Sequence, residues 1–510
     1  MAATLESPPR PAQRSGPVLA CMSVCTALVV GFVAAINLAV PKLAASSLHP
    51  TSSGLLWIVD AYVVIFACLV IPAGAAGDKF GRKGTLLTGL GVFAAGALVS
   101  AAAPNVAVML AGRAVTGLGA ACVLPNCVGV LLHATAPERR PHALAVWAAA
   151  SGIGGVVGNV GGGAVLTGGS WHALFLAVAL VAACCLVWAA RSAPRSARHD
   201  RALDIPGTLL FVAAVVALLI GIIEGPEHGW GSAAVLGAFV CAALLGVCWA
   251  LVELRVAHPV LDPRLLRDAA LGSACLGMAV TFFGNFGLFY VNASLLQYGR
   301  GFSVLETGLG IVPLTVPLLL GTRYVPGLIR RFGVPATLSA AFALTGAGLF
   351  ALSYSSGAGY PVYAAGLVVI GLGIMLAAPC LTARIASALP VERAGIAGGL
   401  QSATRELGSA LGVAVVGTVL TAGFTRHLPA GLAGHTPAPR TVGEALALSP
   451  TDHTAVTSAF TQGADTALRA AALVVLVAGA LVVAGLLRAR GTAPAGQGPG
   501  PASPGRPAGP

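Results

Sequence analysis

Between two long apolar stretches, residues 74–84 read Gly74-Ala75-Ala76-Gly77-Asp78-Lys79-Phe80-Gly81-Arg82-Lys83-Gly84. A turn this short between two membrane helices needs glycine, which tolerates a positive φ. Its charged side chains suit helix ends, carboxylates or lipid phosphates, and an ordinary solvated basic turn would explain the same residues. The segment therefore predicts two helices joined by a tight basic turn at a membrane surface.

The composition places most of the chain in lipid. Of 510 residues, 57% are hydrophobic and only 9% are charged, whereas a soluble protein has about 45–50% apolar and about 25% charged residues. So few charges cannot cover a surface that faces water, which excludes soluble proteins. The net charge of +12 could attract nucleic acid, but its distribution follows membrane topology, and no nucleic-acid partner is expected.

The hydropathy pattern predicts an all-α integral membrane protein with fourteen transmembrane helices, each of about 20 residues. The expected spans are 18–40, 54–76, 84–103, 106–132, 142–168, 171–190, 204–223, 231–252, 271–297, 304–328, 335–354, 358–380, 395–423 and 464–488. The first is too long for a signal peptide and is expected to stay uncleaved. The tail at 489–510 is rich in proline and glycine and is expected to be disordered.

Basic residues in the short loops predict the orientation. With both termini in the cytoplasm, most arginines and lysines fall on the inner side, as at 79–83, 139–140 and 330–331. One missed span would invert every later loop, so the charge bias also supports the span count. We expect a multi-pass protein of the cell membrane with both termini cytoplasmic.

The chain repeats itself at an offset of 252–254 residues. Lys79-Phe80-Gly81 recurs as Arg331-Phe332-Gly333, and the pair Gly154 and Gly158 recurs as Gly408 and Gly412. Spans 1–6 therefore correspond to spans 9–14, and spans 7 and 8 are an insertion. Secondary transporters are often built from such repeats, with the substrate path between them. The expected parts are an N-terminal tail (1–17), a six-helix bundle (18–190), two inserted helices (204–252), a second six-helix bundle (271–488) and a C-terminal tail (489–510).

The segment at 74–84 resembles the second-loop signature of the major facilitator superfamily. The resemblance implies that this loop latches helices together and controls the switch between inward-open and outward-open states. The residues assigned to this gating loop are Gly74, Asp78, Gly81, Arg82 and Lys83. The whole body of the chain, about 18–488, is similar to the fourteen-span drug:proton antiporters of the EmrB/QacA type.

Two opposite charges within the first half are the expected proton-coupling site. Asp60 lies in Trp57-Ile58-Val59-Asp60-Ala61-Tyr62, and Arg113 lies in the fourth span. A charge at such depth costs about 2.5–3.5 kcal/mol on the lenient insertion scale, so it is usually paired, protonated or functional. Both enter from the outer side at similar depth, so we expect them to interact directly or through water. A structural ion pair at a helix end is the alternative for Asp60.

The fifth span resembles the antiporter motif G-x-x-x-G-P-x-x-G-G. The residues at the motif positions are Gly154, Gly158, Asn159, Gly162 and Gly163; the glycines match, and Asn159 replaces the usual proline. Close helix packing alone also explains glycines at this spacing. In the first span, Asn37 fits the family pattern, whereas Phe32 occupies the place of an acid, which argues against strongly cationic substrates.

Six further residues are candidates for the substrate cavity. They are Asn37, Trp57, Tyr62, Gln297, Arg405 and Glu406. The adjacent Arg405 and Glu406 are either a buried local pair or part of the cavity's charge network. The polar segment at 424–463 either shapes substrate release or is a tolerated loop.

No cofactor or metal is expected. The eleven cysteines lie in apolar stretches without metal-ligand spacing, and no glycine is followed by lysine, so a P-loop is absent. A membrane-embedded enzyme would need clustered carboxylates in the loops, which are missing.

The sequence thus predicts a proton-coupled multidrug exporter that moves small amphipathic compounds by alternating access, in lipid and as a monomer. An uptake symporter, a narrow-substrate metabolite exporter and a non-transporting sensor are the alternatives.

Overall fold

The computed structural model describes residues 15–136, 139–194, 204–256, 263–388, 394–435 and 438–491, and every regular element within them is a helix. The terminal tails expected at 1–17 and 489–510 lie mostly outside these ranges. What the structure adds is that α1 already begins at Ser15 and the last helix, α17, ends at Gly491.

Six helices form the first part of the chain, and two more form a hairpin after it. The six are α1 (Ser15–Ala44), α2 (Ser52–Phe80), α3 (Arg82–Ala101), α4 (Val106–Ala134), α5 (Arg140–Gly168) and α6 (Trp171–Ser192). The hairpin consists of α7 (Ile205–His228) and α8 (Ala233–Glu253). Within α8 only Val235 and Glu253 are buried, so this helix packs on α7 and leaves much of its apolar surface exposed.

The last part of the chain repeats the arrangement with one broken helix. Its elements are α9 (Ala269–Ser294), α10 (Val304–Gly310), α11 (Val312–Gly321), α12 (Val325–Ser353), α13 (Tyr360–Ser387), α14 (Ala394–His427), α15 (Ala430–Ala433), α16 (Val442–Leu448) and α17 (His453–Gly491). The span expected at 304–328 is interrupted after Gly310, because Pro313 in the first turn of α11 has no N–H to continue the ladder. The next helix, α12, is kinked at Gly333.

Within the described ranges, twelve helical stretches are long and apolar enough to cross a membrane. Val304–Ser353 is counted among them as one stretch of 50 residues, and α5 is not among them. The fold is therefore that of an all-helical, multi-pass membrane protein.

The two parts of the chain use the same helix contacts. In the first part α5 packs on α1 and α4 on α3; in the last part α14 packs on α9 and α13 on α12. Gly81 and Gly333, related by the sequence repeat, both have positive φ, 101° and 79°. A Cβ added to Gly154 would lie 2.7 Å from the Cα of Ala27, and one added to Gly408 would lie 2.6 Å from the Cα of Ala279. Small residues at equivalent places thus allow equivalent close packing.

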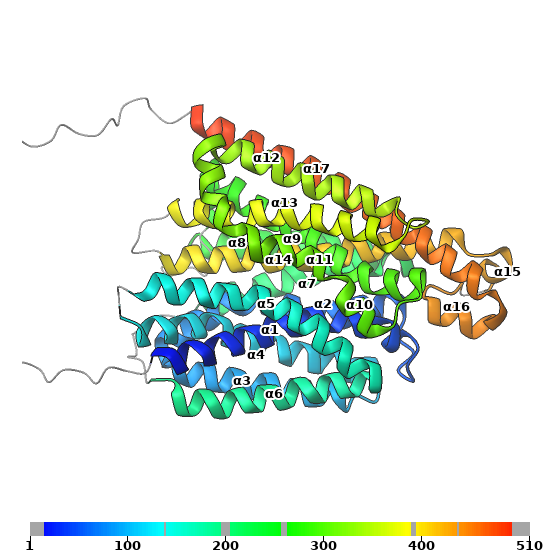
Figure 1. Ribbon diagram of the computed structural model, residues 1–510, viewed down its shortest axis with the longest axis horizontal. Helices are drawn as coiled ribbons and strands as arrows, with labels where there is room; N and C mark the ends of the chain where they lie inside the picture. The colour runs from blue at the N-terminus through cyan, green and yellow to red at the C-terminus, as the bar shows by residue number, and fades with distance from the viewer. Residues whose placement is uncertain are drawn as a thin grey trace, which may run out of the picture.

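Both ends of the described chain lie at the same end of the bundle (Figure 1). We name this the terminal end; the opposite, distal end carries the loop 45–51 and the short helices α15 and α16. Most helices of the first part lie beneath those of the last part in this view, and α2, α7 and α14 lie near the middle. Helix α7 contacts both α2 and α14, so the inserted hairpin lies against both parts.

Candidate proton and substrate site

Asp60 lies in the middle of the bundle on α2. The helix begins where the Thr51 side chain accepts a hydrogen bond from the Gly54 N–H, at 3.1 Å. Asp60 is the ninth residue of the helix, roughly 12 Å from its start at 1.5 Å per residue. Its exposed fraction is 0%, and neither carboxylate oxygen has a hydrogen-bond partner among the described residues. A buried carboxylate without partners is costly in its charged form, so this position favours the proton-bound form.

Arg113 approaches α2 from α4. Asn105 caps α4 by accepting from the Val108 N–H at 3.0 Å, and Gly117 lets α4 approach the backbone of α2, because its Cβ would lie 2.5 Å from the Tyr62 carbonyl oxygen. The Arg113 side chain is fully buried. Its Nε donates to the Ile58 carbonyl at 2.7 Å and its Nη2 to the Val59 carbonyl at 3.2 Å.

Asp60 and Arg113 were expected to interact directly or through water, and the direct contact is not formed. No ion pair within 4.0 Å joins them in the part of the chain that the structure describes. Two of the three guanidinium nitrogens of Arg113, Nε and Nη2, donate to the carbonyls of Ile58 and Val59, whereas the buried Nη1 has no hydrogen-bond partner among the described residues. Arg113 therefore lies beside the acid's own helical turn while leaving the carboxylate unpaired.

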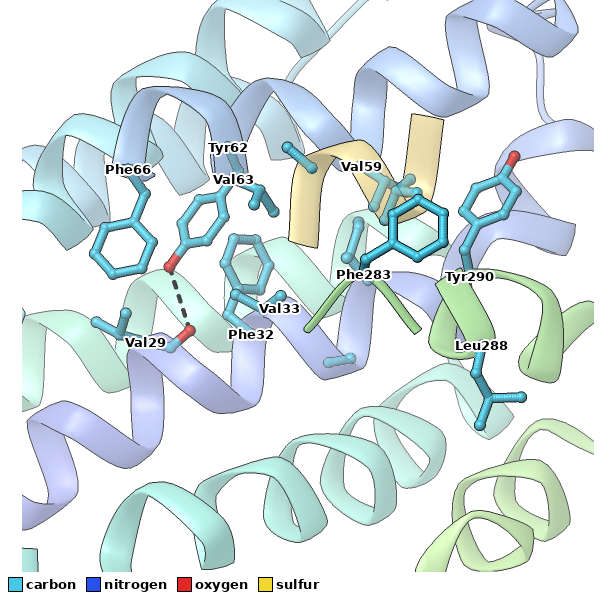
Figure 2. Packing of buried hydrophobic residues seen from close by; sticks show 14 of the residues in the cluster. Val29, Phe32, Val33, Val59, Tyr62, Val63, Phe66, Phe283, Leu288 and Tyr290 are labelled. Carbon is cyan, nitrogen blue, oxygen red and sulfur yellow. Dashed lines mark hydrogen bonds between the residues drawn. The ribbon is translucent and has the colours of Figure 1, made fainter. Parts of the chain in front are cut away.

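Two aromatic rings complete the arginine's surroundings. The Arg113 Cζ lies 4.9 Å from the ring centroid of Phe32 and 4.8 Å from that of Tyr62. These rings meet edge to face at 5.8 Å, and the Tyr62 hydroxyl donates to the Val29 carbonyl at 3.2 Å (Figure 2). Phe32, which the sequence suggested only as a missing acid, thus serves as a cation–π partner.

The gating-loop residues make their described contacts within the first part of the chain. Asp78 and Arg82 form an ion pair at 2.6 Å, Arg82 donates to the Pro125 carbonyl of α4 at 3.5 Å, and Lys83 donates to the Ala190 carbonyl of α6 at 2.8 Å. Gly74 faces Pro125 at 3.5 Å from the position of an added Cβ, and a Cβ on Gly77 would collide with Asn126. No motif in the sequence singles out this asparagine, although Pro125 beside it belongs to the repeat.

The glycines of α5 form its contact with α1. Added Cβ atoms on Gly154 and Gly162 would come within 2.7 Å of Ala27 and 2.8 Å of Ala35, and one on Gly158 would collide with the Gly31 backbone. Gly163 instead faces α10, where an added Cβ would lie 3.0 Å from the Val304 carbonyl oxygen.

Asn159, which replaces the expected proline, leaves α5 continuous. Its side chain donates to the Gly155 carbonyl at 3.0 Å. Its own carbonyl oxygen lies 2.5 Å from the Cβ position of Gly308 on α10. Asn159 thus lies where α5 of the first part meets α10 of the last part.

Trp57 and Gln297 connect separate parts of the chain. The Trp57 Nε1 donates to Glu224 of α7 at 3.2 Å, and Thr418 of α14 donates to the Ile222 carbonyl of α7 at 3.1 Å. Near the distal end, Gln297 donates to the Leu38 carbonyl of α1 at 3.4 Å. The role of Glu224 as partner of Trp57 could not be read from the sequence, because the two residues are far apart in the chain.

The distal end is closed. The Tyr298 hydroxyl donates to the Pro41 carbonyl at 3.4 Å. A cavity of about 50 Å³ lies here, lined by residues from both parts that include Leu55, Tyr290 and Phe424. Small-molecule sites occupy about 300–1,000 Å³, so this space admits no drug-sized molecule. Asn37, one turn deeper on α1, is buried and its Oδ1 has no partner among the described residues.

Arg405 and Glu406 on α14, expected as a buried local pair or as part of the cavity's charge network, form a local ion pair in which only the acid is buried. The Arg405 Nη2 lies 2.6 Å and its Nε 2.7 Å from Glu406 Oε1. The side chain of Arg405 is 27% exposed and that of Glu406 only 5%. The acid is thus buried behind its arginine.

Comparison with known sequences gives one consistent result. The profile of the Major Facilitator Superfamily matches residues 22–413. Three similar curated proteins are the multidrug resistance protein Stp of Mycobacterium tuberculosis (31% identity; 79% of this chain, 75% of that protein), a methylenomycin A resistance protein of Streptomyces coelicolor (32%; 78% and 85%) and the cephamycin export protein CmcT of Amycolatopsis lactamdurans (32%; 84% and 89%).

Solved structures agree on the fold. A bacterial homologue of the human lysosomal transporter Spinster, in an inward-facing and unoccupied conformation, aligns with a TM-score of 0.65 over 95% of this chain and 99% of that chain, at 17% identity. A peptide transporter of the POT family aligns with a TM-score of 0.64 over 93% and 94%, at 12% identity.

Proposed function

The chain belongs to the major facilitator superfamily, and we propose that it is a proton-coupled exporter of small amphipathic compounds, of the fourteen-span drug:proton antiporter type. Members of this superfamily are transporters, so the chain is a multi-pass membrane transporter and not an enzyme. The relatives at about 30% identity carry names of drug-resistance and export proteins, which supports export of small molecules as its activity.

We assign fourteen spans by counting α5 as a span and by dividing the stretch Val304–Ser353 at the Gly333 kink. The proposed division is two six-helix bundles, 18–190 and 271–488, with an inserted hairpin at 204–252. The hairpin's contacts with α2 and α14 support this division, since α7 lies along the seam between the bundles.

One observation carries the proposal of proton coupling. Asp60 is fully buried, both of its oxygens lack partners, and the nearby Arg113 is held by carbonyls instead of by the acid. A carboxylate held in an ion pair is stabilised in its charged form and resists protonation. Asp60 is free to bind a proton in one conformation and lose it in another.

The proposed orientation has both termini in the cytoplasm, since basic residues gather at the terminal end. The distal end then faces outside and is closed in this state, with Gln297, Tyr298 and Asn159 joining the two bundles. Export requires these contacts to break, and the 74–84 loop is proposed to control that change.

The direction of coupling separates antiport from the symport alternative. Purified protein is placed in vesicles with an imposed pH gradient, and movement of a fluorescent lipophilic dye is followed. Antiport predicts that dye moves against its gradient toward the acidic side, and that dissipating the pH gradient stops it. Dye movement in the same direction as protons would contradict export and favour an uptake symporter.

A further inference from the structure

A stripe of aromatic side chains on α9 is not used by the proton site. Phe282, Asn285, Phe286 and Phe289 are spaced i, i+3, i+4 and i+7, so they share one face of the helix. The rings of Phe282 and Phe286 are 6.2 Å apart, and those of Phe286 and Phe289 are 5.8 Å apart. All four residues are partly exposed.

The neighbouring faces of α9 are filled by its own bundle. Gly277 lies against Leu381 of α13 and Gly284 against Val475 of α17, whereas Phe283 lies against Gly412 of α14. At 100° per residue, these contacts leave the stripe pointing between α13 and α14, away from the core of its bundle. The stripe therefore faces the space between the two bundles, where a transported molecule travels in this kind of fold.

Arg405 lies at one end of the stripe. Its Cζ is 5.7 Å from the ring centroid of Phe282. Two of its nitrogens bind Glu406, and its Nη1 makes no hydrogen bond within the described residues. Because Glu406 is buried and Arg405 is partly exposed, an approaching molecule meets the guanidinium and not the carboxylate.

Two amide oxygens also lack partners here. Asn285 Oδ1, in the stripe, is a buried atom without a hydrogen-bond partner among the described residues, as is Asn37 Oδ1 of α1. The positions on α1 that the repeat relates to the stripe hold the smaller residues Val30, Val33, Ala34 and Asn37. The four equivalent positions of α1 thus carry no aromatic ring, and the stripe has no counterpart in the first bundle at these positions.

We propose that the α9 stripe and Arg405 form a binding platform for planar aromatic molecules that carry an anionic group. The rings stack on the ligand's aromatic system, and the free Nη1 of Arg405 donates to its carboxylate or phenolate. Lipophilic cations are disfavoured, because the acids Asp60 and Glu406 are both buried and the accessible charge is positive. This inference rests on the proposed transport function and names the substrate class of its cavity.

The test measures binding to purified protein in lipid nanodiscs, with three fluorescent probes that share one ring system: 2-naphthoate, 2-naphthamide and 2-naphthyltrimethylammonium. We expect the anion to bind about tenfold or more tightly than the cation, the range for a hydrogen bond to a charged group. Replacing the pair together, Arg405→Gln with Glu406→Gln, should remove this preference without stranding a buried charge. Phe282→Leu should weaken all three probes about two- to tenfold, whereas Phe350→Leu on α12 should not.

Several results would overturn the inference. They are equal or tighter binding of the cation, a preference for the anion that survives in the double variant, and no binding of any probe. Proton coupling is assayed separately: proton movement evoked by a cationic dye, without anion preference, would remove this inference and leave the proposed function intact. Anion-selective binding without any substrate-evoked proton movement would support the platform and contradict the coupling.

Discussion

At the scale of single residues, Arg113 is stabilised by groups other than Asp60, so Asp60 is not held in an ion pair with it. Arg113 is stabilised by the carbonyls of Ile58 and Val59 and by two rings. Asp60 has no such partner and can change its protonation state. The nearby charge of Arg113 stabilises the ionised form of Asp60, whereas burial away from water destabilises it.

Variants of Tyr62 separate the contribution of its hydroxyl from that of its ring. Tyr62→Phe loses the hydrogen bond to the Val29 carbonyl and keeps the ring, so it should cost about 1 kcal/mol of stability. Tyr62→Leu also loses the cation–π contact and the edge contact with Phe32 and should cost more. Thermal unfolding in detergent measures both, and a Leu variant as stable as the Phe variant would argue against the ring's role.

Asp60 and Arg113 stand out in the sequence because each is a charged residue within an apolar span. Their geometry could not be predicted, because carbonyls compete with carboxylates for a guanidinium and every residue carries a carbonyl. The cation–π contact between Phe32 and Arg113 could be predicted only by asking which arginine faces the place of the missing acid.

At the scale of elements, glycines decide which helix faces meet. On α5, a Cβ at Gly158 would collide with the Gly31 backbone, whereas one at Gly155 would meet nothing within 4 Å. Gly158→Ala should therefore destabilise the protein by about 1–3 kcal/mol and reduce transport.

Gly155→Ala is the matched control on the same helix. Alanine favours a helix over glycine by about 0.5–1 kcal/mol, so this variant should be unchanged or more stable. Both are compared by thermal unfolding and dye efflux. Equal loss in the two variants would mean that helix propensity, and not the α1–α5 contact, governs this segment.

The turn between α2 and α3 depends on backbone geometry. Gly81 has φ 101° and ψ 124°, which other residues rarely adopt, whereas Gly84 is helical with open space around it. Gly81→Ala should cost about 1–3 kcal/mol, and Gly84→Ala should not. Purified yield and unfolding temperature measure the difference; a fully stable Gly81→Ala protein would show that the turn tolerates another conformation.

The sequence predicted the helices well because each must be long and apolar, and it placed the tight turn at 81 through its glycines. The break after Gly310 was not predicted, because Pro313 lies in an apolar run that reads as continuous. Several helices, such as α1 and α17, also extend beyond the ends of the predicted spans. The sequence also indicates a polar loop at 424–463, and the structure has the short helices α15 and α16 there.

At the scale of the whole molecule, the two bundles meet at the distal end and must separate there for export. Gly163 lies 3.3 Å, measured from an added Cβ, from the Cα of Leu305. A disulfide between Gly163→Cys and Leu305→Cys, in a background without the native cysteines, should lock this end closed and abolish efflux under oxidising conditions. Reducing agent should restore it, and full efflux by the cross-linked protein would contradict alternating access through this end.

The repeat could be predicted from the sequence because its glycines and prolines recur at nearly one offset. Contacts between the bundles could not, because one sequence alone does not show which distant residues meet. The position of the inserted hairpin against α2 and α14 is such a contact.

The central claim is that Asp60 carries the coupled proton. Its most direct test is proton movement in proteoliposomes that hold a pH-sensitive dye, on addition of a panel of amphipathic compounds, for wild type and for Asp60→Asn. Asparagine keeps the shape of the side chain and cannot take up a proton. We predict substrate-evoked proton movement in wild type and its loss in the folded Asn variant; movement that persists in Asp60→Asn would contradict the account.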